Sequence, residues 1–226
     1  MRGEADISAA AALLSEPARA ALVVALTEHE ALPASALAAH AGIAPSTASE
    51  HLRRLVEGGF IMVRKNGRHR YFSLADPAVA DAVEALAVVA PQPPVRSLRE
   101  ATKSELIRQA RTCFDHLAGR LGVALAAALE EQEVVARRNG DYELGPGAEA
   151  RCEALGIDLA ELRAQRRPVV RGCLDWSERE LHVAGALGAA LATRLFALGW
   201  IRRREGNRSV EVADQARLVS ELGLEV

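Results

Sequence analysis

The chain has 226 residues, of which 50% are hydrophobic and only 4% aromatic, and its formal net charge is −2 at pH 7. This length exceeds that of one small DNA-binding domain and predicts two domains. No apolar run approaches the roughly 18 residues of a membrane span, and the N-terminal MRGEADIS lacks the apolar core of a signal peptide. We therefore expect a cytoplasmic protein with no membrane partner, and three cysteines fit that reducing compartment.

Two helices are predicted near the N-terminus, over residues 13–26 and 34–42. Leu22, Val23 and Leu26 have the spacing of one buried helix face. Gly42 can end the second helix, because glycine adopts positive φ without strain. A three-residue turn then precedes the next helix, which is the order of a helix-turn-helix unit.

A third helix is predicted over residues 46–56. Pro45 suits a first helical turn, where its missing N–H costs nothing, and Ser46 and Thr47 can cap the free N–H groups. Leu52 and Leu55 mark its buried side. Gly58-Gly59 ends it, a strand begins at Phe60, and Asn66-Gly67 predicts a tight turn before a returning strand that contains Tyr71, Phe72 and Leu74.

This helix and hairpin differ in charge from the rest of the chain. Between His51 and Phe72 there are six basic residues and one acidic residue, a local balance of +5. A positive patch on a mildly acidic protein is typical of a face that binds a DNA duplex, since phosphate neutralisation releases counterions. The alternative is a solvated hairpin whose arginines only maintain solubility.

The segments LSEPARAALVVAL, SALAAHAGIAPSTASEHLRRLVEGGFI and VRKNGRHRYFSLAD, taken in order, resemble the ArsR family of bacterial winged-helix transcription regulators over about residues 8–90. The resemblance implies that helix 46–56 is the recognition helix and hairpin 64–71 the wing. It also implies double-stranded DNA with an inverted-repeat operator as the partner. The candidate DNA-binding residues are Ser46, Thr47, Ser49, His51, Arg53, Arg54, Lys65, Asn66, Arg68, His69 and Arg70.

The resemblance also implies a homodimer, formed by helices near residues 7–14 and 77–89. Val79, Val83, Leu86 and Ala90 have helical spacing that agrees with an apolar dimer face, although a contact within the monomer's own core is the alternative. Many relatives sense metals through a cysteine pair before the recognition helix, or through Asp and His on the last helix. Residues 34–40 contain no cysteine and residues 77–89 no histidine, so we expect these familiar metal sites to be absent.

The second half of the chain contains an internal repeat. Residues 91–97, with three prolines in four positions, predict a linker after a winged-helix domain over residues 1–90. In the C-terminal domain, residues 98–226, a copy over about residues 113–158 is echoed over about 173–226. The matches His116–His182, Gly119–Gly185, Gly122–Gly188 and Leu129–Leu195 share an offset of 66. Each copy predicts a winged-helix-like helix, hairpin and helix, with turns at Asn139-Gly140 and Gly206-Asn207.

Each copy also carries a cysteine, a carboxylate and an imidazole. The candidate effector-binding residues are Cys113, Asp115, His116, Cys173, Asp175, Trp176 and His182. Such side chains bind soft or borderline metals, and a cysteine beside a histidine can become a reactive thiolate. A pseudo-two-fold arrangement would bring the two sets together. Structural roles in the core, a small-molecule pocket shared by the copies and a metal site all remain open; no cofactor is certain.

The predicted fold is mainly α with small β-hairpins (α+β), an N-terminal winged helix-turn-helix followed by a C-terminal domain of two related halves. The predicted function is a sequence-specific DNA-binding repressor, controlled by an effector or redox signal at the C-terminal domain. The alternative is a C-terminal domain that only dimerises or binds proteins. No phosphate loop, nucleophile elbow or H-E-x-x-H motif is present, so we predict no enzymatic activity and no catalytic residues.

Overall fold

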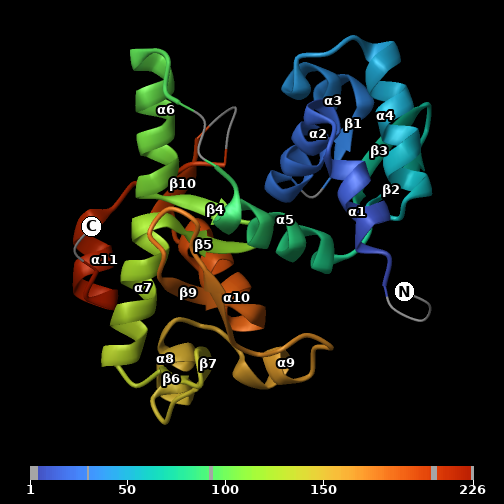
Figure 1. The fold of residues 1–226 in the computed structure, drawn as a ribbon. Coiled ribbons are helices and arrows are strands. Elements are labelled where there is room, and N and C mark those ends of the chain that lie inside the picture. Colours follow the sequence, from blue (N-terminus) through green and yellow to red (C-terminus); the bar gives the residue numbers. More distant parts are fainter. Residues whose placement is uncertain (1–4, 30, 92–93, 205–207, 225–226) are drawn as a thin grey trace. The chain divides into compact units, whose positions relative to one another are not determined.

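The computed structural model describes residues 5–29, 31–91, 94–204 and 208–224. The chain forms two compact units, Met1–Glu84 and Ala85–Val226 (Figure 1). The division falls inside helix α5 (Pro77–Val89), before the linker predicted at residues 91–97. Two residues of that linker, Gln92 and Pro93, lie outside the described residues.

The N-terminal unit packs helices against a three-stranded antiparallel sheet of order β1-β3-β2. Its elements are α1 (Ile7–Leu14), α2 (Pro17–Glu28), β1 (Leu32–Pro33), α3 (Ala34–Ala41), α4 (Pro45–Glu57), β2 (Ile61–Asn66) and β3 (His69–Leu74). The helix expected near residues 7–14 is α1, and the helix predicted over residues 13–26 is α2 but begins later than predicted. Pro17 occupies the first turn of α2 and cannot continue α1, which ends at Leu14.

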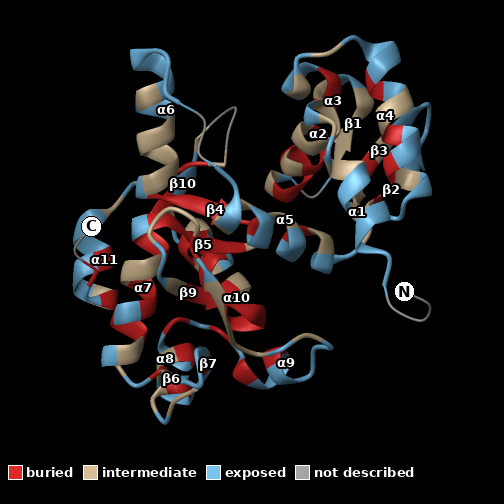
Figure 2. Cartoon of the chain, viewed as in Figure 1, coloured by how far each residue is buried: buried red, intermediate tan, exposed pale blue. Residues whose placement is uncertain are grey.

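The core of this unit joins residues from α2, α3, α4 and the wing strands. Leu22, Val23 and Leu26 are at most 1% exposed, and so are Leu52 and Leu55, as their helical spacing predicts. Figure 2 shows buried stretches along the helices of this unit. No single helix of the described ranges is long and apolar enough to cross a membrane. The bent pair α1 and α2 reaches the required length and composition only when taken together.

The wing turn is displaced by one residue from the prediction. Asn66 is the last residue of β2 and pairs with His69, so the turn consists of Gly67 and Arg68 rather than Asn66 and Gly67. Gly67 has φ of +59°, a conformation that glycine adopts without strain. At the end of α4, Gly59 takes the positive φ, whereas Gly58 lies so close to Leu13 that a Cβ atom would overlap it.

After the end of α5, the C-terminal unit continues with α6 (Leu98–Gln109) and then repeats one pattern twice. The first half comprises β4 (Arg111–Cys113), β5 (His116–Ala118), α7 (Gly119–Glu131), β6 (Val135–Arg138), β7 (Asp141–Leu144), α8 (Ala148–Ala154) and α9 (Leu159–Arg163). The second comprises β8 (Arg171–Leu174), β9 (Leu181–Ala184), α10 (Gly185–Ala197), β10 (Ile201–Arg203), β11 (Val210–Val212) and α11 (Gln215–Leu222). Each half is therefore hairpin, helix, hairpin and helix, with one hairpin more than predicted.

The offset of 66 residues reappears in three dimensions. Helices α7 and α10 each have 13 residues and begin 66 positions apart. Asn139 and Gly140 form the predicted turn between β6 and β7, both with positive φ. The matching turn predicted at Gly206-Asn207 lies outside the described residues.

The two halves share one hydrophobic core. Equivalent leucines of α7 and α10 meet in it, namely Leu121, Leu125 and Leu129 with Leu187, Leu191 and Leu195. The halves also exchange contacts, because α7 packs against β9 and α10 packs against β5 (Figure 1). The first hairpins of both halves are thereby held side by side.

Candidate functional site

The N-terminal end of α4 presents polar side chains to solvent. Ser46, Thr47 and Ser49 are exposed, and His51 is half-buried on the same helix. The expectation that Ser46 or Thr47 caps the helix is wrong, since no side chain caps the first turn and Ala44 is the N-cap residue. The Ser49 hydroxyl donates to the carbonyl oxygen of Pro45 at 2.9 Å. The first turn of α4 thus has no side-chain cap, and its backbone N–H groups suit an anion such as phosphate.

The two arginines of α4 are engaged in ion pairs on the helix itself. Arg53 contacts Glu50 at 2.8 Å and also Glu57, and Arg54 contacts Glu50 at 2.8 Å. The hydrogen bonds from Arg53 and then Arg54 lower the pKa of Glu50 to about 2. Glu50 lies just outside the segment over which the sequence charge was counted. The positive surface is therefore centred on the wing rather than on α4, although exposed pairs of this kind are weak enough to exchange for a phosphate.

The wing carries an uninterrupted exposed polar run. Residues 64–70 are all exposed. The predicted DNA-binding residues Lys65, Asn66, Arg68 and His69 therefore all face solvent. Arg70 is also exposed, and its guanidinium carbon lies 5.4 Å from the centre of the Phe72 ring. Phe72 is 2% exposed and belongs to the core. The basic edge of the wing is thus anchored to the body of the unit.

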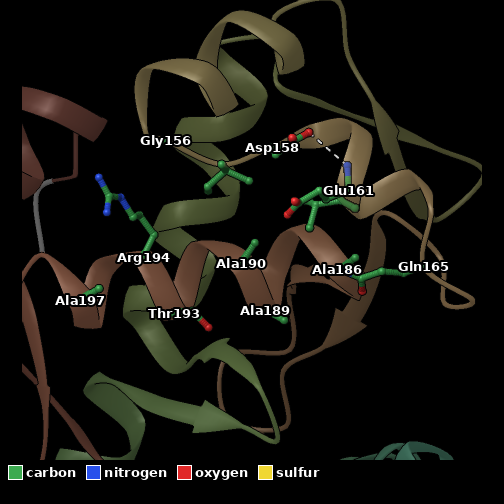
Figure 3. Close-up of a pocket in the computed structure, with 12 residues that line it drawn as sticks. Gly156, Asp158, Glu161, Gln165, Ala186, Ala189, Ala190, Thr193, Arg194 and Ala197 are labelled. Carbon is green, nitrogen blue, oxygen red and sulfur yellow. Dashed lines mark hydrogen bonds between the residues drawn. The ribbon is translucent and has the colours of Figure 1, made fainter.

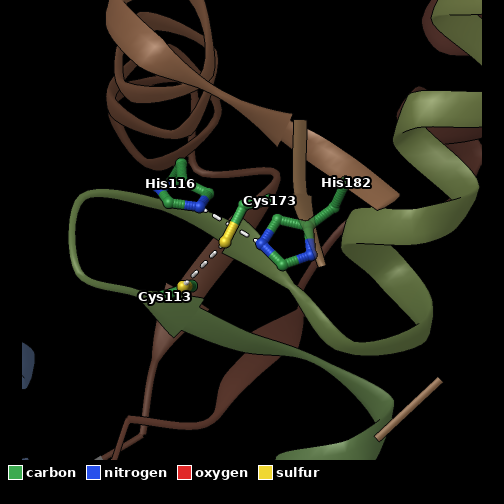
Figure 4. A group of neighbouring side chains, drawn as sticks. All are labelled: Cys113, His116, Cys173 and His182. Carbon is green, nitrogen blue, oxygen red and sulfur yellow. Dashed lines mark hydrogen bonds between the residues drawn. The ribbon is translucent and has the colours of Figure 1, made fainter. Parts of the chain in front are cut away.

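A second site lies in the C-terminal unit, where the hairpins β4–β5 and β8–β9 face each other. Within the first hairpin Cys113 pairs across the strands with His116, and within the second Cys173 pairs with His182. Residues directly opposite on an antiparallel pair project on the same face. Each hairpin therefore presents one cysteine and one histidine, and the four side chains converge (Figure 4).

The distances define a compact cluster. The Sγ atoms of Cys113 and Cys173 are 3.9 Å apart, and the Nε2 atoms of His116 and His182 are 3.2 Å apart. One donor atom from each residue lies within 4.8 Å of all the others. His116 and His182 are each 1% exposed and Cys113 is 2% exposed, while Cys173 is half-buried. We call these four residues the Cys–His cluster.

A carboxylate lies behind each histidine. Asp115 Oδ1 is 3.2 Å from His116 Nδ1, and Asp175 Oδ2 is 3.3 Å from His182 Nδ1. Asp115 is in turn paired with Arg167. These contacts turn the Nδ1 side of both imidazoles outward and the Nε2 side toward the centre of the Cys–His cluster. The two predicted aspartates thus contact the histidines on the side away from the centre of the Cys–His cluster.

Asp175 is fully buried and almost completely satisfied. It accepts hydrogen bonds from Arg111 at 2.9 Å and from the backbone N–H of Gly119 at 2.7 Å and of Ser177 at 2.9 Å. The Arg111 side chain is also 0% exposed, and its guanidinium carbon lies 4.6 Å from the centre of the Trp176 ring. Trp176 therefore covers this ion pair rather than lining the Cys–His cluster directly.

The charges within the cluster follow from these contacts. The hydrogen bond with Cys113, followed by those with His116 and His182, lowers the pKa of the Cys173 thiol to about 2 in spite of burial. Burial opposes a charge on His182, but Asp175 and the Cys173 sulfur outweigh it and raise the pKa of His182. Burial is likewise outweighed at Asp175, whose pKa lies below its usual range because of His182 and Arg111. These surroundings thus favour the charged forms of the Cys173 thiol and the His182 imidazole.

Two further features were not predicted. Arg111 precedes Cys113 by two residues, as Arg171 precedes Cys173, so the repeated Arg-x-Cys was the available signal. The second feature is the close packing around Gly122 and Gly188. A Cβ atom at either position would lie 2.5 Å from a backbone carbonyl oxygen of its own half, that of Leu117 or Val183. The same Cβ atoms would lie 3.6 Å from His182 Cβ and 3.2 Å from His116 Cβ in the other half.

An open groove of about 470 Å³ is separate from this cluster (Figure 3). Alanines of α10 form its floor, and Gly156, Asp158 and Glu161 lie along one side. Arg194 at its edge donates to the Leu155 carbonyl oxygen at 2.6 Å. None of the seven predicted effector residues lines this groove. This groove is therefore not the small-molecule pocket that was considered for the two Cys-Asp-His sets.

The fold of the first unit defines the class of protein: a winged helix-turn-helix DNA-binding protein with an additional C-terminal unit. A family model described as a helix-turn-helix domain matches residues 14–64. The "Uncharacterized HTH-type transcriptional regulator YdfF" of Bacillus subtilis is 39% identical over 221 residues, which is 98% of each chain. The chain belongs to this family of HTH-type transcriptional regulators, and the recognition made from the sequence motifs is confirmed.

Solved structures match the N-terminal part of the chain. The transcriptional repressor BigR from Xylella fastidiosa is 27% identical, with a TM-score of 0.36, and the match covers 39% of this chain and 89% of that one. A homodimeric winged helix-turn-helix domain from Mycobacterium bovis, described as a possible ArsR-family regulator, is 25% identical with a TM-score of 0.35. That match also covers 39% of this chain and 89% of the other.

Proposed function

We propose that the protein is a cytoplasmic, homodimeric repressor of the ArsR type that binds an inverted-repeat operator and is controlled through its C-terminal unit. The observation that carries the DNA-binding part is the exposed basic wing, residues 64–70, beside an α4 whose first turn is open. The wing contains four basic residues, whereas the chain as a whole has a net charge of −2. Phosphate contacts by the wing would hold α4 in register with the bases of the major groove.

Replacing Arg68 and Arg70 together by alanine should weaken binding to any duplex. Both side chains are exposed on the wing, so their loss removes phosphate contacts without disturbing the core. Each lost contact should flatten the slope of log affinity against log salt by about 0.9 and cost roughly tenfold in affinity near 0.1 M salt. Fluorescence anisotropy with a labelled duplex over a series of salt concentrations measures both quantities.

The matched control is Arg138→Ala with Arg202→Ala, which removes the same charge from exposed strands of the C-terminal unit. We expect this control to keep nearly the original salt slope. An unchanged slope in the Arg68→Ala/Arg70→Ala variant, or an equal loss in the control, would contradict the wing assignment.

The proposed dimer would use the exposed apolar side of α5. Leu86 is 50% exposed and Val89 is 77% exposed, as is Ile7 on α1. Val83 is half-buried and packs against the N-terminal core, so a charge there would disturb folding as well as assembly. One recognition helix reads only a few base pairs, and useful specificity requires two.

Replacing Leu86 and Val89 by glutamate should therefore give a folded monomer that no longer discriminates its operator. Sedimentation equilibrium should show a mass near twice the chain mass of 24.1 kDa for the unaltered protein and near 24.1 kDa for the variant. Val219→Glu on α11, another exposed apolar position, serves as the control and should stay dimeric. A double variant that remains dimeric would refute this interface.

A further inference from the structure

The Cys–His cluster combines four metal-ligating side chains with almost complete burial. Two soft sulfur donors and two imidazole donors meet within 4.8 Å, and each half of the repeat supplies one of each kind. A core built for packing alone has no need to direct four polar donor atoms at one point, because burying polar groups costs free energy unless they are satisfied. We propose that this cluster binds one zinc-class divalent ion, Zn²⁺ or its heavier congener Cd²⁺, in a tetrahedral S₂N₂ site.

The spacing of the donors fits such an ion. With Zn–S bonds of about 2.3 Å and Zn–N bonds of about 2.05 Å, a regular tetrahedron places two sulfurs about 3.8 Å apart and two nitrogens about 3.3 Å apart. The structure has 3.9 Å between the Sγ atoms and 3.2 Å between the Nε2 atoms. The ligands need almost no rearrangement along these two edges. Four protein ligands also leave no open position, which is typical of a non-catalytic site.

The surroundings of the histidines support the same ligand set. Histidines that bind metals usually donate the other ring N–H to a carboxylate, which fixes the tautomer and orients the ring. Asp115 makes this hydrogen bond with His116 at 3.2 Å, and the Asp175 carboxylate lies 3.3 Å from His182 Nδ1 without the alignment of a hydrogen bond. Both imidazoles therefore direct Nε2 at the ion, and this arrangement occurs twice although the two hairpins differ in loop length.

The charge of a bound divalent ion would be balanced by groups already present at the Cys–His cluster. Two thiolates neutralise a divalent ion, while Arg167 and Arg111 neutralise Asp115 and Asp175. The ion takes the place of two protons, one shared between the Cys113 and Cys173 sulfurs and one shared between the two Nε2 atoms, and both protons pass to solvent. The exchange leaves the buried cluster neutral, so no uncompensated charge is created.

The repeated glycines lie beside the ligands of the opposite half. A Cβ atom at Gly188 would lie 3.2 Å from His116 Cβ, and one at Gly122 would lie in ordinary contact with His182 Cβ at 3.6 Å. A bound ion would link the hairpins β4–β5 and β8–β9 and thereby the two halves of the unit. This proposal rests on the proposed regulatory role of the C-terminal unit, for which it names a ligand. Metal binding can nevertheless be measured in the absence of DNA. It can therefore fail or succeed independently of the proposed DNA binding.

The test uses the full chain, reduced and treated with chelator, then loaded with Zn²⁺ or Co²⁺ under anaerobic conditions. We expect one tightly held zinc per chain by elemental analysis after dialysis. The Co²⁺ form should show the intense visible bands of tetrahedral cobalt and a thiolate-to-cobalt charge-transfer band. Zn²⁺ should also raise the melting temperature, because a ligand of the folded state stabilises it by mass action.

Variants separate the site from general cysteine effects. Cys113→Ser with Cys173→Ser should abolish stoichiometric zinc, the charge-transfer band and the zinc-dependent stabilisation. Cys152→Ser, which changes the buried cysteine of α8 outside the cluster, should retain all three. Asp115→Asn should weaken zinc affinity by about 10- to 100-fold, since it alters only the group that orients His116.

Substoichiometric zinc in the unaltered chain would overturn the proposal, and so would a cobalt spectrum without thiolate ligation. These two results do not depend on whether the double serine variant folds. Equal loss in Cys152→Ser, or a Cys113–Cys173 disulfide that persists in the presence of reductant and excludes zinc, would also overturn it.

Discussion

Replacing Arg111 by methionine is expected to lower the free energy of unfolding of the C-terminal unit by about 3–5 kcal/mol. Arg111 and Asp175 are both 0% exposed, and their ion pair lies at 2.9 Å beneath Trp176. Methionine preserves much of the side-chain volume but leaves the Asp175 carboxylate buried without its cation. The cost arises because a buried charge that has lost its partner cannot be compensated by water.

Urea denaturation followed by tryptophan fluorescence measures this effect. Trp176 and Trp200 are the only tryptophans of the chain, and both belong to the C-terminal unit. Arg120→Met is the control, since the ion pair of Arg120 with Glu105 is about half-exposed and should contribute less than about 1 kcal/mol. Equal small losses in both variants would show that the Arg111–Asp175 pair does not anchor the hairpins.

Replacing Gly122 and Gly188 together by alanine is expected to destabilise the same unit and to impair the Cys–His cluster. The new Cβ atoms would lie 2.5 Å from the carbonyl oxygens of Leu117 and Val183, which are backbone atoms that cannot rotate away. Overpacking of this kind costs about 1–3 kcal/mol at each position. Helix propensity acts in the opposite direction, because alanine favours a helix interior over glycine by about 1 kcal/mol.

The sign of the change therefore decides between close packing and simple helix propensity. Ala189→Gly removes a methyl group from the neighbouring position of α10 and should cost only about 1 kcal/mol. Stabilisation by the Gly122→Ala/Gly188→Ala pair would contradict the close packing of α7 on β5 and of α10 on β9. A shift of His116 and His182 should also weaken zinc binding if the proposed site is correct.

The winged-helix part of the fold was predictable because its signals are local. Pro45, the leucine spacing of α4, Gly59 and the charged hairpin each act within a few residues, and all lie where the sequence places them. The errors arose from neighbours just beyond a motif. Pro17 begins α2 four residues after the predicted start, and Glu50 pairs with arginines that had been expected to be available for DNA.

The C-terminal unit was predictable in its symmetry but not in its detail. The repeat correctly indicated that the two Cys-Asp-His sets lie together, because equivalent positions of related halves meet in one core. The β4–β5 and β8–β9 hairpins were missed, since β4 and β5 have only three residues each and the second copy has a longer loop. Arg111 was missed because arginine is almost never fully buried unless it is paired, and its partner lies 64 positions away.

Selection of DNA from a random-sequence pool by the purified full-length protein tests the proposed function most directly. We expect enrichment of an inverted repeat whose half-sites are centred about one helical turn apart, roughly 10 base pairs, as a two-fold dimer requires. The Arg68→Ala/Arg70→Ala protein should enrich little or nothing under the same salt conditions. No enrichment by the unaltered protein, or a single unrepeated half-site bound by a monomer, would contradict the account.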